Sequence, residues 1–424
     1  MTNLITYFSL AGLAVFSAIK KYWLIVALFC VLPFYAFLIT FSAHIFNLDF
    51  SQLELIRLFK ELIMFGVFAG LIYQWIKNRK NSNLKFEFQI SDFFIVLYLI
   101  IILGSIFVHG SSLREALFGI RYDFFFLFYY FIFRLFFLFY KDKSDSLIKI
   151  IFWTSLPVFV FAILQFFVLP HNFLEQFGYA KEALSQFDIK GAIPAFQLLG
   201  NSNLVRVHSF FSGPNQLAAY SLVIIFLALA KVLGKKRDIL AYFVATLGII
   251  TLILTFSRSA ILGFIIGILI LSFINIRRRP IFGGIVLGSI LAILLLGGLL
   301  FREQLYEIVV RPSSSGWHLA YFQDGYKLFL ENPFGIGLSK VGPASQWTNQ
   351  AMVSESFYLQ IALEVGFFGL IIFLSFMILL IWELARHKTQ IAYTTICTII
   401  AILIASLFLH TLADGILAIY VGFV

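Results

Sequence analysis

The sequence contains few charged residues and very few cysteines. Only 12% of its 424 residues are charged, whereas 61% are hydrophobic. This shortage of charge excludes a soluble protein and predicts an all-α integral membrane protein with many spans. The two cysteines, Cys30 and Cys397, both lie within apolar runs. They indicate neither a disulfide framework nor a redox compartment.

Several kinds of functional motif are also missing. No group of His, Cys, Asp and Glu has the spacing of a metal site, and no glycine-rich phosphate loop follows a predicted strand. We therefore expect no metal and no cofactor. The formal net charge is +10, but the basic residues form short clusters between apolar runs. That pattern reflects membrane topology and argues against nucleic-acid binding.

Long apolar runs dominate the chain, and a helix needs about 20 apolar residues to cross roughly 30 Å of hydrocarbon. A shorter run, residues 4–19, either lies on the membrane or forms one more short span. It has no basic start and no clear cleavage site, which favours a retained segment over a signal peptide. We predict a polytopic bundle of about 11–12 transmembrane helices. The long runs are residues 22–46, 55–76, 93–108, 117–139, 147–169, 215–233, 238–256, 259–275, 281–301, 356–382 and 391–412.

Basic clusters fall on alternate connections between these runs, which places those connections in the cytoplasm. The two long connections, residues 170–214 and 302–355, then face outward. We expect one transmembrane domain, residues 1–424, whose function lies in these outer loops. The cytoplasmic clusters are Lys20 and Lys21; Lys77, Arg79, Lys80 and Lys85; Lys141 and Lys143; Lys235, Lys236 and Arg237; Arg277, Arg278 and Arg279; and Arg386 and Lys388.

The second outer loop contains a predicted amphipathic helix. After SSSG at 313–316, the segment WHLAYFQDGYKLFLE places Leu319, Phe322, Tyr326 and Phe329 on one stripe at helical spacing. We expect this helix to lie at the outer interface of the membrane. NPFGIG at 332–337 ends the helix with turn residues.

Arginine is the more frequent cation on the outer side, whereas lysine is more frequent on the inner side. A guanidinium group binds phosphate or carboxylate in a bidentate manner, so these arginines are candidate substrate ligands. Arg121, two residues before Asp123, either forms a structural ion pair between neighbouring helices or faces substrate. Arg258, in TFSRSA, is either a ligand or a helix cap or headgroup anchor. Arg206 and the weaker candidate Arg311 are either ligands or solvated loop charges.

Three further residues are candidates near the first outer loop and the run 356–382. Asn215, in SGPNQLA, is expected to cap a helix whose positive end faces outward beside Arg206, an arrangement that suits a phosphate unless it is simple capping. His208 is a candidate ligand or a satisfied loop histidine. Tyr358 either lines the site or packs in the core.

Glu355 is the most unusual acid in the chain because it stands immediately before the apolar run 356–382. Partial burial would raise its pKa toward neutrality, and nearby arginines would oppose that rise. It is therefore a candidate general base or substrate ligand, or an acid stabilised by the helix dipole. Glu364, deeper in the same run, is expected to pair inside the bundle.

These motifs together resemble the bacterial O-antigen ligase and O-antigen polymerase family of membrane glycosyltransferases. The resemblance covers roughly residues 200–380, while the earlier spans match only in hydropathy. It rests on RVHSFFSGPNQLAAYS at 206–221, TFSRSAILG at 255–263, an arginine, a Trp-started helix and NPFGIGLSKVG at 311–342, and ESFYLQIALEVGFFG at 355–369.

The resemblance implies a metal-independent, inverting transferase of the GT-C type in the bacterial inner membrane. Its donor would be an undecaprenyl-diphosphate-linked glycan whose diphosphate is held by Arg206 and Arg258 at a site facing the periplasm. Ligases of this family carry a histidine in HNxYLQ, whereas this chain has Glu355, Ser356 and Phe357 before YLQ. That departure favours a polymerase, with Glu355 as base and a second lipid-linked repeat as acceptor, and a chain-length regulator is an optional partner.

Three alternatives remain open. A ligase would transfer the glycan to another lipid or to protein, using a base such as His208 or His318. A solute or bicarbonate transporter should show repeat symmetry and broken helices near the midplane. No inverted repeat is evident in the sequence. A non-catalytic scaffold or flippase partner would leave glycan length unchanged when Arg206 and Arg258 are neutralised.

Overall fold

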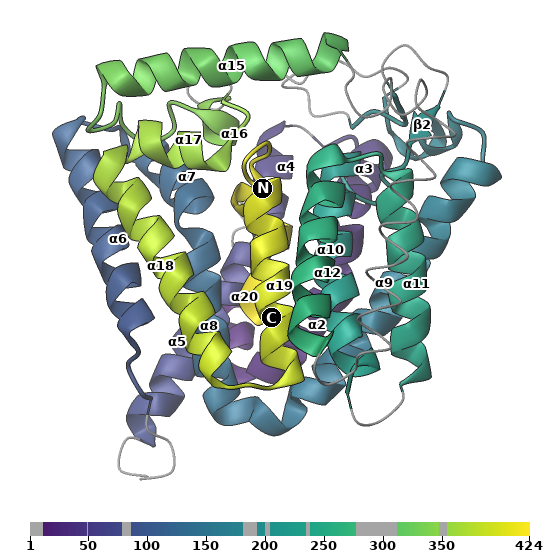
Figure 1. The fold of residues 1–424 in the computed structure, drawn as a ribbon, viewed down its shortest axis with the longest axis horizontal. Coiled ribbons are helices and arrows are strands. Elements are labelled where there is room, and N and C mark those ends of the chain that lie inside the picture. The colour runs from purple at the N-terminus through teal and green to yellow at the C-terminus, as the bar shows by residue number, and fades with distance from the viewer. Residues whose placement is uncertain are drawn as a thin grey trace.

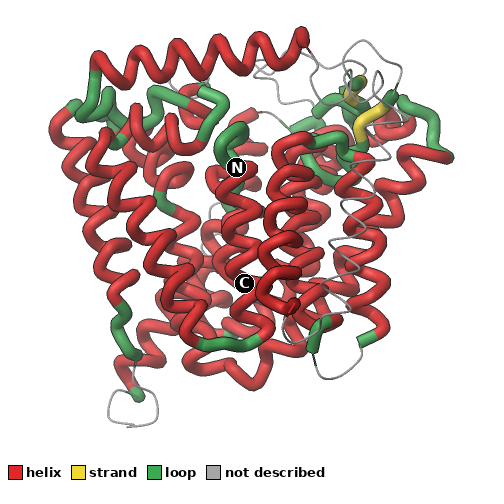
Figure 2. Tube along the Cα trace, in the orientation of Figure 1, coloured by secondary structure: helices red, strands yellow, loops and turns green. Residues whose placement is uncertain are grey.

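The computed structural model shows a bundle of long helices with very little β-structure (Figures 1 and 2). It describes residues 12–48, 50–78, 86–180, 193–199, 204–234, 238–276, 312–346 and 354–424. Within these ranges the strands β1 (Gln197–Leu198) and β2 (Val205–Arg206) form a two-stranded antiparallel sheet. The predicted all-α, polytopic membrane bundle is confirmed.

The helices follow the apolar runs of the sequence closely. Residues 12–19 are also helical and pack against α5 at Gly66 and Gly70, where a Cβ would meet the backbone of this segment. The first half contains α2 (Lys21–Val31), η1 (Leu32–Phe34), α3 (Tyr35–Phe46), α4 (Phe50–Arg57), α5 (Phe59–Lys77), α6 (Ile90–Val108), α7 (Leu113–Asp123), α8 (Phe125–Tyr140), η3 (Lys141–Lys143), α9 (Ser144–Phe167) and η4 (Phe173–Phe177).

The second half has the same character, with two short helices before its long ones. It contains α10 (Pro214–Val232), α11 (Ile239–Leu254), α12 (Arg258–Ile276), α15 (Pro312–Glu331), α16 (Gly342–Ser345), α17 (Phe357–Glu364), α18 (Gly366–Arg386), α19 (Gln390–Ala405), η5 (Thr411–Ala413) and α20 (Gly415–Phe423).

Among the described residues, seven stretches are long and apolar enough to cross a membrane. One of them, Phe125–Phe167, contains both α8 and α9, and the shorter helices α11 and α19 are also apolar. The predicted span at 281–301 lies outside the described residues. The seven stretches are Lys21–Phe46, Phe59–Lys77, Ile90–Val108, Phe125–Phe167, Pro214–Val232, Arg258–Ile276 and Gly366–Arg386.

The core forms around α10. In its most apolar window 78% of the residues are buried, against 28% for α18, so α10 is an interior helix and α18 lies at the periphery. Helix α10 packs against α11, α12 and α19, and its Tyr220 ring meets Tyr420 of α20 edge to face. These contacts bury a large continuous apolar cluster, which supplies most of the packing within the bundle.

The two ends of the bundle differ. At one end, the bottom of Figure 1, the chain turns between α8 and α9 and between α18 and α19, beside Lys141, Lys143, Arg386 and Lys388. We call this the basic end. At the opposite end α15 lies across the bundle above α17 and α16 (Figure 1), and we call this the α15 end.

Helix α15 starts at Pro312, earlier than the predicted start after SSSG, because proline suits the first helical position. Its Gly325 lies against Leu359 of α17, and its Leu328 and Phe329 pack on a small apolar cluster of α17 residues. The expected stripe is therefore divided: Phe329 is partly buried, while three other members, Leu319, Phe322 and Tyr326, are exposed.

Four predicted spans are not single continuous helices, and in that respect the predictions are wrong. The run 22–46 contains η1, the run 55–76 is interrupted at Leu58, and the other two divide as follows. The run 117–139 divides at Phe124 into α7 and α8, and the run 356–382 divides at Val365 into α17 and α18. Gly366 has φ +81, and a Cβ there would lie 2.6 Å from the Phe334 carbonyl. Only glycine accepts both the left-handed backbone and this close approach.

Candidate active site

Arg206 lies at the α15 end of the bundle, on the short strand β2 beside the start of α10. Its Nε donates to the Thr255 carbonyl at 3.0 Å, and its Nη2 donates to Asn215 Oδ1 at 2.9 Å. Asn215 Oδ1 also accepts from the Ser257 hydroxyl at 3.0 Å. The half-buried guanidinium therefore joins β2, α10 and the turn between α11 and α12.

The start of α10 differs from the prediction at one residue. Gly213 is the N-cap and Pro214 occupies the first helical position, so Asn215 is not the cap. Its side chain is used instead to accept from Arg206 and Ser257. Gly213 supplies no side-chain acceptor to the first amides of α10. The hydrogen bond between Asn215 and Arg206 places these amides, and the positive end of the α10 dipole, close to Arg206.

Arg258 is the first residue of α12 and is half-buried. The preceding turn has Phe256 at φ +50, and the Ser257 amide donates to Thr255 Oγ1 at 3.2 Å. Thr255, which accepts from Arg206, is only three residues before Arg258. The structure therefore places Arg206, Asn215 and the Arg258 turn in one region.

His208 lies in the same loop but has no exposed surface. Its Nδ1 is 3.1 Å from the Phe211 carbonyl, its Nε2 is 3.1 Å from the Ala195 carbonyl, and its ring stacks on Tyr179. Burial lowers the pKa of this imidazole. These contacts favour the structural alternative of the sequence analysis, a satisfied loop histidine.

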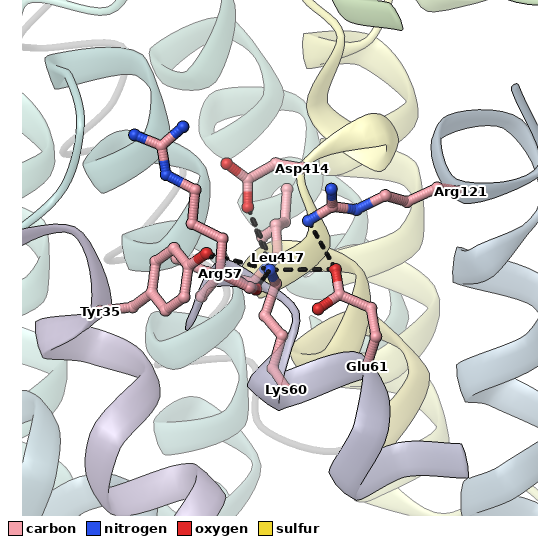
Figure 3. Close-up of polar contacts among 8 residues, drawn as sticks. Tyr35, Arg57, Lys60, Glu61, Arg121, Asp414 and Leu417 are labelled. Carbon is pink, nitrogen blue, oxygen red and sulfur yellow. Dashed lines mark hydrogen bonds and ion pairs between the residues drawn. The ribbon is translucent and has the colours of Figure 1, made fainter. Parts of the chain in front are cut away.

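Arg121 pairs with a partner that the sequence did not indicate. Its Nη2 lies 2.7 Å from Oε1 of Glu61 on α5, so Arg121 forms an ion pair between two helices, with Glu61 and not Asp123 as the partner (Figure 3). The same Glu61 oxygen lies 3.0 Å from Lys60 Nζ. The Lys60 and Glu61 side chains are only 4% and 5% exposed, whereas the Arg121 side chain is 22% exposed.

Lys60 is surrounded by further oxygens. Its Nζ donates to the Tyr35 hydroxyl at 3.3 Å and to the Arg57 carbonyl at 3.2 Å. Asp414 lies nearby and caps α20 by accepting from the Ile416 and Leu417 amides at 2.9 and 3.0 Å (Figure 3). We call Arg57, Lys60, Glu61, Arg121 and Asp414 the α5–α7 charge cluster.

Asp123 and Glu364 occupy the ends of the two short helices, where the chain breaks. Gln360 Nε2 donates to Asp123 Oδ1 at 2.7 Å, and the Val341 amide donates to Glu364 Oε1 at 2.8 Å. Both carboxyl groups are fully buried. Burial raises the pKa of both, and the Asp123 charge raises the pKa of Glu364 further. Glu364 thus pairs inside the bundle, as the sequence suggests.

Glu355 is half-buried in the short connection that leads into α17. This connection is fixed by the Phe357 amide, which donates to the Ser406 carbonyl at 3.0 Å. Beside it, the backbone of Ser354 interacts with His410. Burial lowers the pKa of His410 to about 4, so its imidazole is neutral at physiological pH.

The remaining candidates are less informative. The Tyr358 hydroxyl donates to the Leu403 carbonyl at 2.8 Å, and its ring meets Phe373 edge to face, so this residue ties α17 to α19. Arg311 lies outside the described residues. Within the described part of the chain, no group of three or more His, Cys, Asp or Glu residues could hold a metal ion.

One comparison with known proteins finds a match. Residues 241–374 match the O-antigen ligase family model. The match runs from α11 into α18 and includes Arg258, Glu355 and Tyr358. It confirms the resemblance to the O-antigen ligase family that the motifs predict. No curated protein matches the chain.

Several residues of the chain escaped the sequence analysis. Lys60 and Glu61 were the most visible of them, because adjacent opposite charges inside the apolar run 55–76 are costly unless they are paired. His410 and Asp414, in HTLADG after the last apolar run, had a weaker signal. Neither their partners nor their depth could be read from spacing.

Proposed function

We propose that this membrane protein is a glycosyltransferase that polymerises undecaprenyl-diphosphate-linked oligosaccharide repeats. The O-antigen ligase family match supports a ligase or polymerase type of membrane glycosyltransferase. It gives no support to a solute or bicarbonate transporter. The whole chain would act as one membrane domain in the bacterial inner membrane, with the α15 end facing the periplasm.

The arrangement around Arg206 carries this proposal. A cation held by neutral oxygens, the uncapped amides at the start of α10, and the Arg258 turn come together at one end of the bundle. Helix N-termini and guanidinium groups are the usual ligands of phosphate groups in proteins. We assign this region to the donor diphosphate, and Arg311 belongs to the same proposal from sequence alone.

In the proposed reaction, Glu355 takes the proton of an acceptor sugar hydroxyl as the hydroxyl oxygen attacks the anomeric carbon of the donor glycan. The bond from that carbon to the diphosphate oxygen breaks, and the lipid diphosphate leaves with the electron pair. Arg206 and Arg258 stabilise the negative charge that develops on the leaving group. Attack from the opposite face inverts the anomeric centre.

The function is tested by supplying purified protein with undecaprenyl-diphosphate oligosaccharide and no other acceptor. Longer lipid-linked chains are the expected product. If product forms only after a distinct lipid or protein acceptor is added, the chain is a ligase. If Arg206→Gln with Arg258→Gln leaves chain length in cells unchanged, the chain is a scaffold for another enzyme.

The base is tested with two matched variants, Glu355→Gln and His410→Asn. We expect Glu355→Gln to reduce turnover by roughly 10²- to 10⁴-fold while donor binding is retained. His410→Asn should retain most of its activity. The opposite result, with His410→Asn inactive and Glu355→Gln active, would assign the base to His410 and leave Glu355 as a helix-end acid.

A further inference from the structure

The α5–α7 charge cluster contains one more cation than its carboxylates balance. Its cations are Arg57, Lys60 and Arg121, and its acids are Glu61 and Asp414. Glu61 pairs with both Lys60 and Arg121. Arg57 is different because, among the described residues, its half-buried guanidinium forms no hydrogen bond or ion pair. An unbalanced cation at this depth is costly unless an anion binds to it.

Two hydrogen bonds hold the backbone of Arg57 in place. Its carbonyl accepts from both the Tyr35 hydroxyl, at 3.1 Å, and Lys60 Nζ. Lys60 is therefore used to hold the α4–α5 turn. In the view of Figure 3, the guanidinium groups of Arg57 and Arg121 lie to either side of the Asp414 carboxyl group. The two groups able to meet a ligand are thus arginines, which suit phosphate oxygens.

A mostly apolar cavity of about 480 Å³ extends to Leu412 of η5 at one side, and Glu87, Arg134, Glu383 and His387 are also among its lining residues. It is lined by α8, α18, α19 and α20, including Phe126, Phe376 and Leu403, and Leu412 of η5 is among its lining residues. Leu412 is two residues before Asp414, so the cavity and the charge cluster both adjoin η5. Such a pairing of a long apolar cavity and a cationic cluster matches a lipid with an anionic head group.

We propose that Arg57 and Arg121 bind the diphosphate of a second lipid-linked glycan, the acceptor, whose prenyl chain lies in the cavity between α8, α18, α19 and α20. The identification of this lipid as the acceptor rests on the proposed polymerase function. The site itself uses α4, α5 and α7, which are different elements from the β2, α10 and α12 region assigned to the donor. A polymerase must hold two lipid diphosphates at once, whereas a ligase need hold only one.

Binding of farnesyl diphosphate to the full-length purified protein tests the site directly. We expect two molecules to bind to the natural protein and one to bind to Arg57→Gln, with the affinity of the lost site reduced roughly tenfold or more. Arg57→Gln is suitable because, among the described residues, the Arg57 side chain forms no hydrogen bond or ion pair that the change would break. The matched control is Arg114→Gln, which removes an exposed arginine of α7 that contacts only the Phe118 ring.

Three ligands distinguish the possible sources of the phosphate. If inorganic pyrophosphate displaces farnesyl diphosphate from this site as well as unlabelled farnesyl diphosphate does, the prenyl part of the proposal is wrong. If vesicles of phosphatidylglycerol displace it equally well, the site is a general head-group site and the acceptor assignment fails. Unchanged stoichiometry and affinity in Arg57→Gln would overturn the site altogether.

Turnover is measured separately, so that the two proposals can fail independently. If the natural protein makes no longer chains but Arg57→Gln still loses one farnesyl diphosphate, the polymerase function fails and the phosphate site stands. If the natural protein polymerises and Arg57→Gln shows the same KM for the lipid-linked repeat, the function stands and the acceptor site fails.

Discussion

The two arginine-containing regions at the α15 end hold their cations in different ways. Arg206 donates to a carbonyl and to a side-chain amide, which are neutral acceptors. Arg121 lies against the Glu61 carboxylate, which also serves Lys60. A neutral acceptor orients a guanidinium without cancelling its charge, whereas a carboxylate does both. Among these contacts, the first region therefore orients its guanidinium through neutral groups, whereas the second pairs two of its cations with one carboxylate.

The largest expected effect comes from removing the carboxylate of the second region. Glu61→Gln leaves Lys60 and Arg121 without a counter-charge in a buried position, and we expect a loss of roughly 3–5 kcal/mol of stability. A thermal unfolding scan in detergent measures it. Unfolding at the temperature of the natural protein would mean that the two cations find other partners.

Removing the cation of the first region should affect catalysis instead. We expect Arg206→Gln to lower turnover by roughly 10²- to 10³-fold, because one stabilising charge on the leaving diphosphate is lost. Its unfolding temperature should change much less than that of Glu61→Gln. Single-turnover assays measure the loss of turnover in Arg206→Gln, with Arg114→Gln as the control. Equal turnover in Arg206→Gln and Arg114→Gln would contradict the donor assignment.

Replacing the neutral acceptor Asn215 with a carboxylate would give Arg206 the kind of partner that Arg121 has in the second region. Asn215→Asp keeps an oxygen for Arg206 and Ser257 but adds a negative charge. We expect donor affinity to fall roughly tenfold with the fold retained, since the new carboxylate competes with the diphosphate for the guanidinium. Donor KM at low and high salt measures this change, and an unchanged KM would show that the charge of Arg206 is not used for binding.

The smallest expected effect tests whether Tyr358 belongs to either region. Tyr358→Phe removes the hydrogen bond to the Leu403 carbonyl and little else. We expect a loss of about 1 kcal/mol of stability and no change in turnover. A fall in turnover without a fall in unfolding temperature would instead place the hydroxyl at the substrate.

The sequence predicted the bundle well because hydrocarbon imposes one rule on every span. A crossing segment must be helical and apolar over about 20 residues, and that rule can be read locally. The breaks at Phe124 and Val365 could not be read in this way. The second depends on Gly366 meeting the backbone of Phe334, a residue from a distant turn.

The site residues show the same division. Arg206, Asn215 and Arg258 were identified because each stands in a short polar motif between apolar runs, and the structure brings these motifs together. The ion-pair partners were not predictable from the sequence. Arg121 pairs with Glu61 on α5, although Asp123 is only two residues from Arg121 in the chain. Capping was also misjudged at Asn215, because an asparagine near a helix start suits a cap and a tertiary acceptor equally well.

The short helices α7 and α17 form a floor beneath α15. Their carboxyl-bearing ends, Asp123 and Glu364, lie against each other, with Gln360 donating to Asp123 and the Val341 amide donating to Glu364. Because burial raises the pKa of both acids, the pair carries less negative charge than two exposed carboxylates would. In the proposed reaction, the hydrated glycan lies above α7 and α17 and the hydrocarbon lies below them, so these two helices separate the sugar chemistry from the lipid chain.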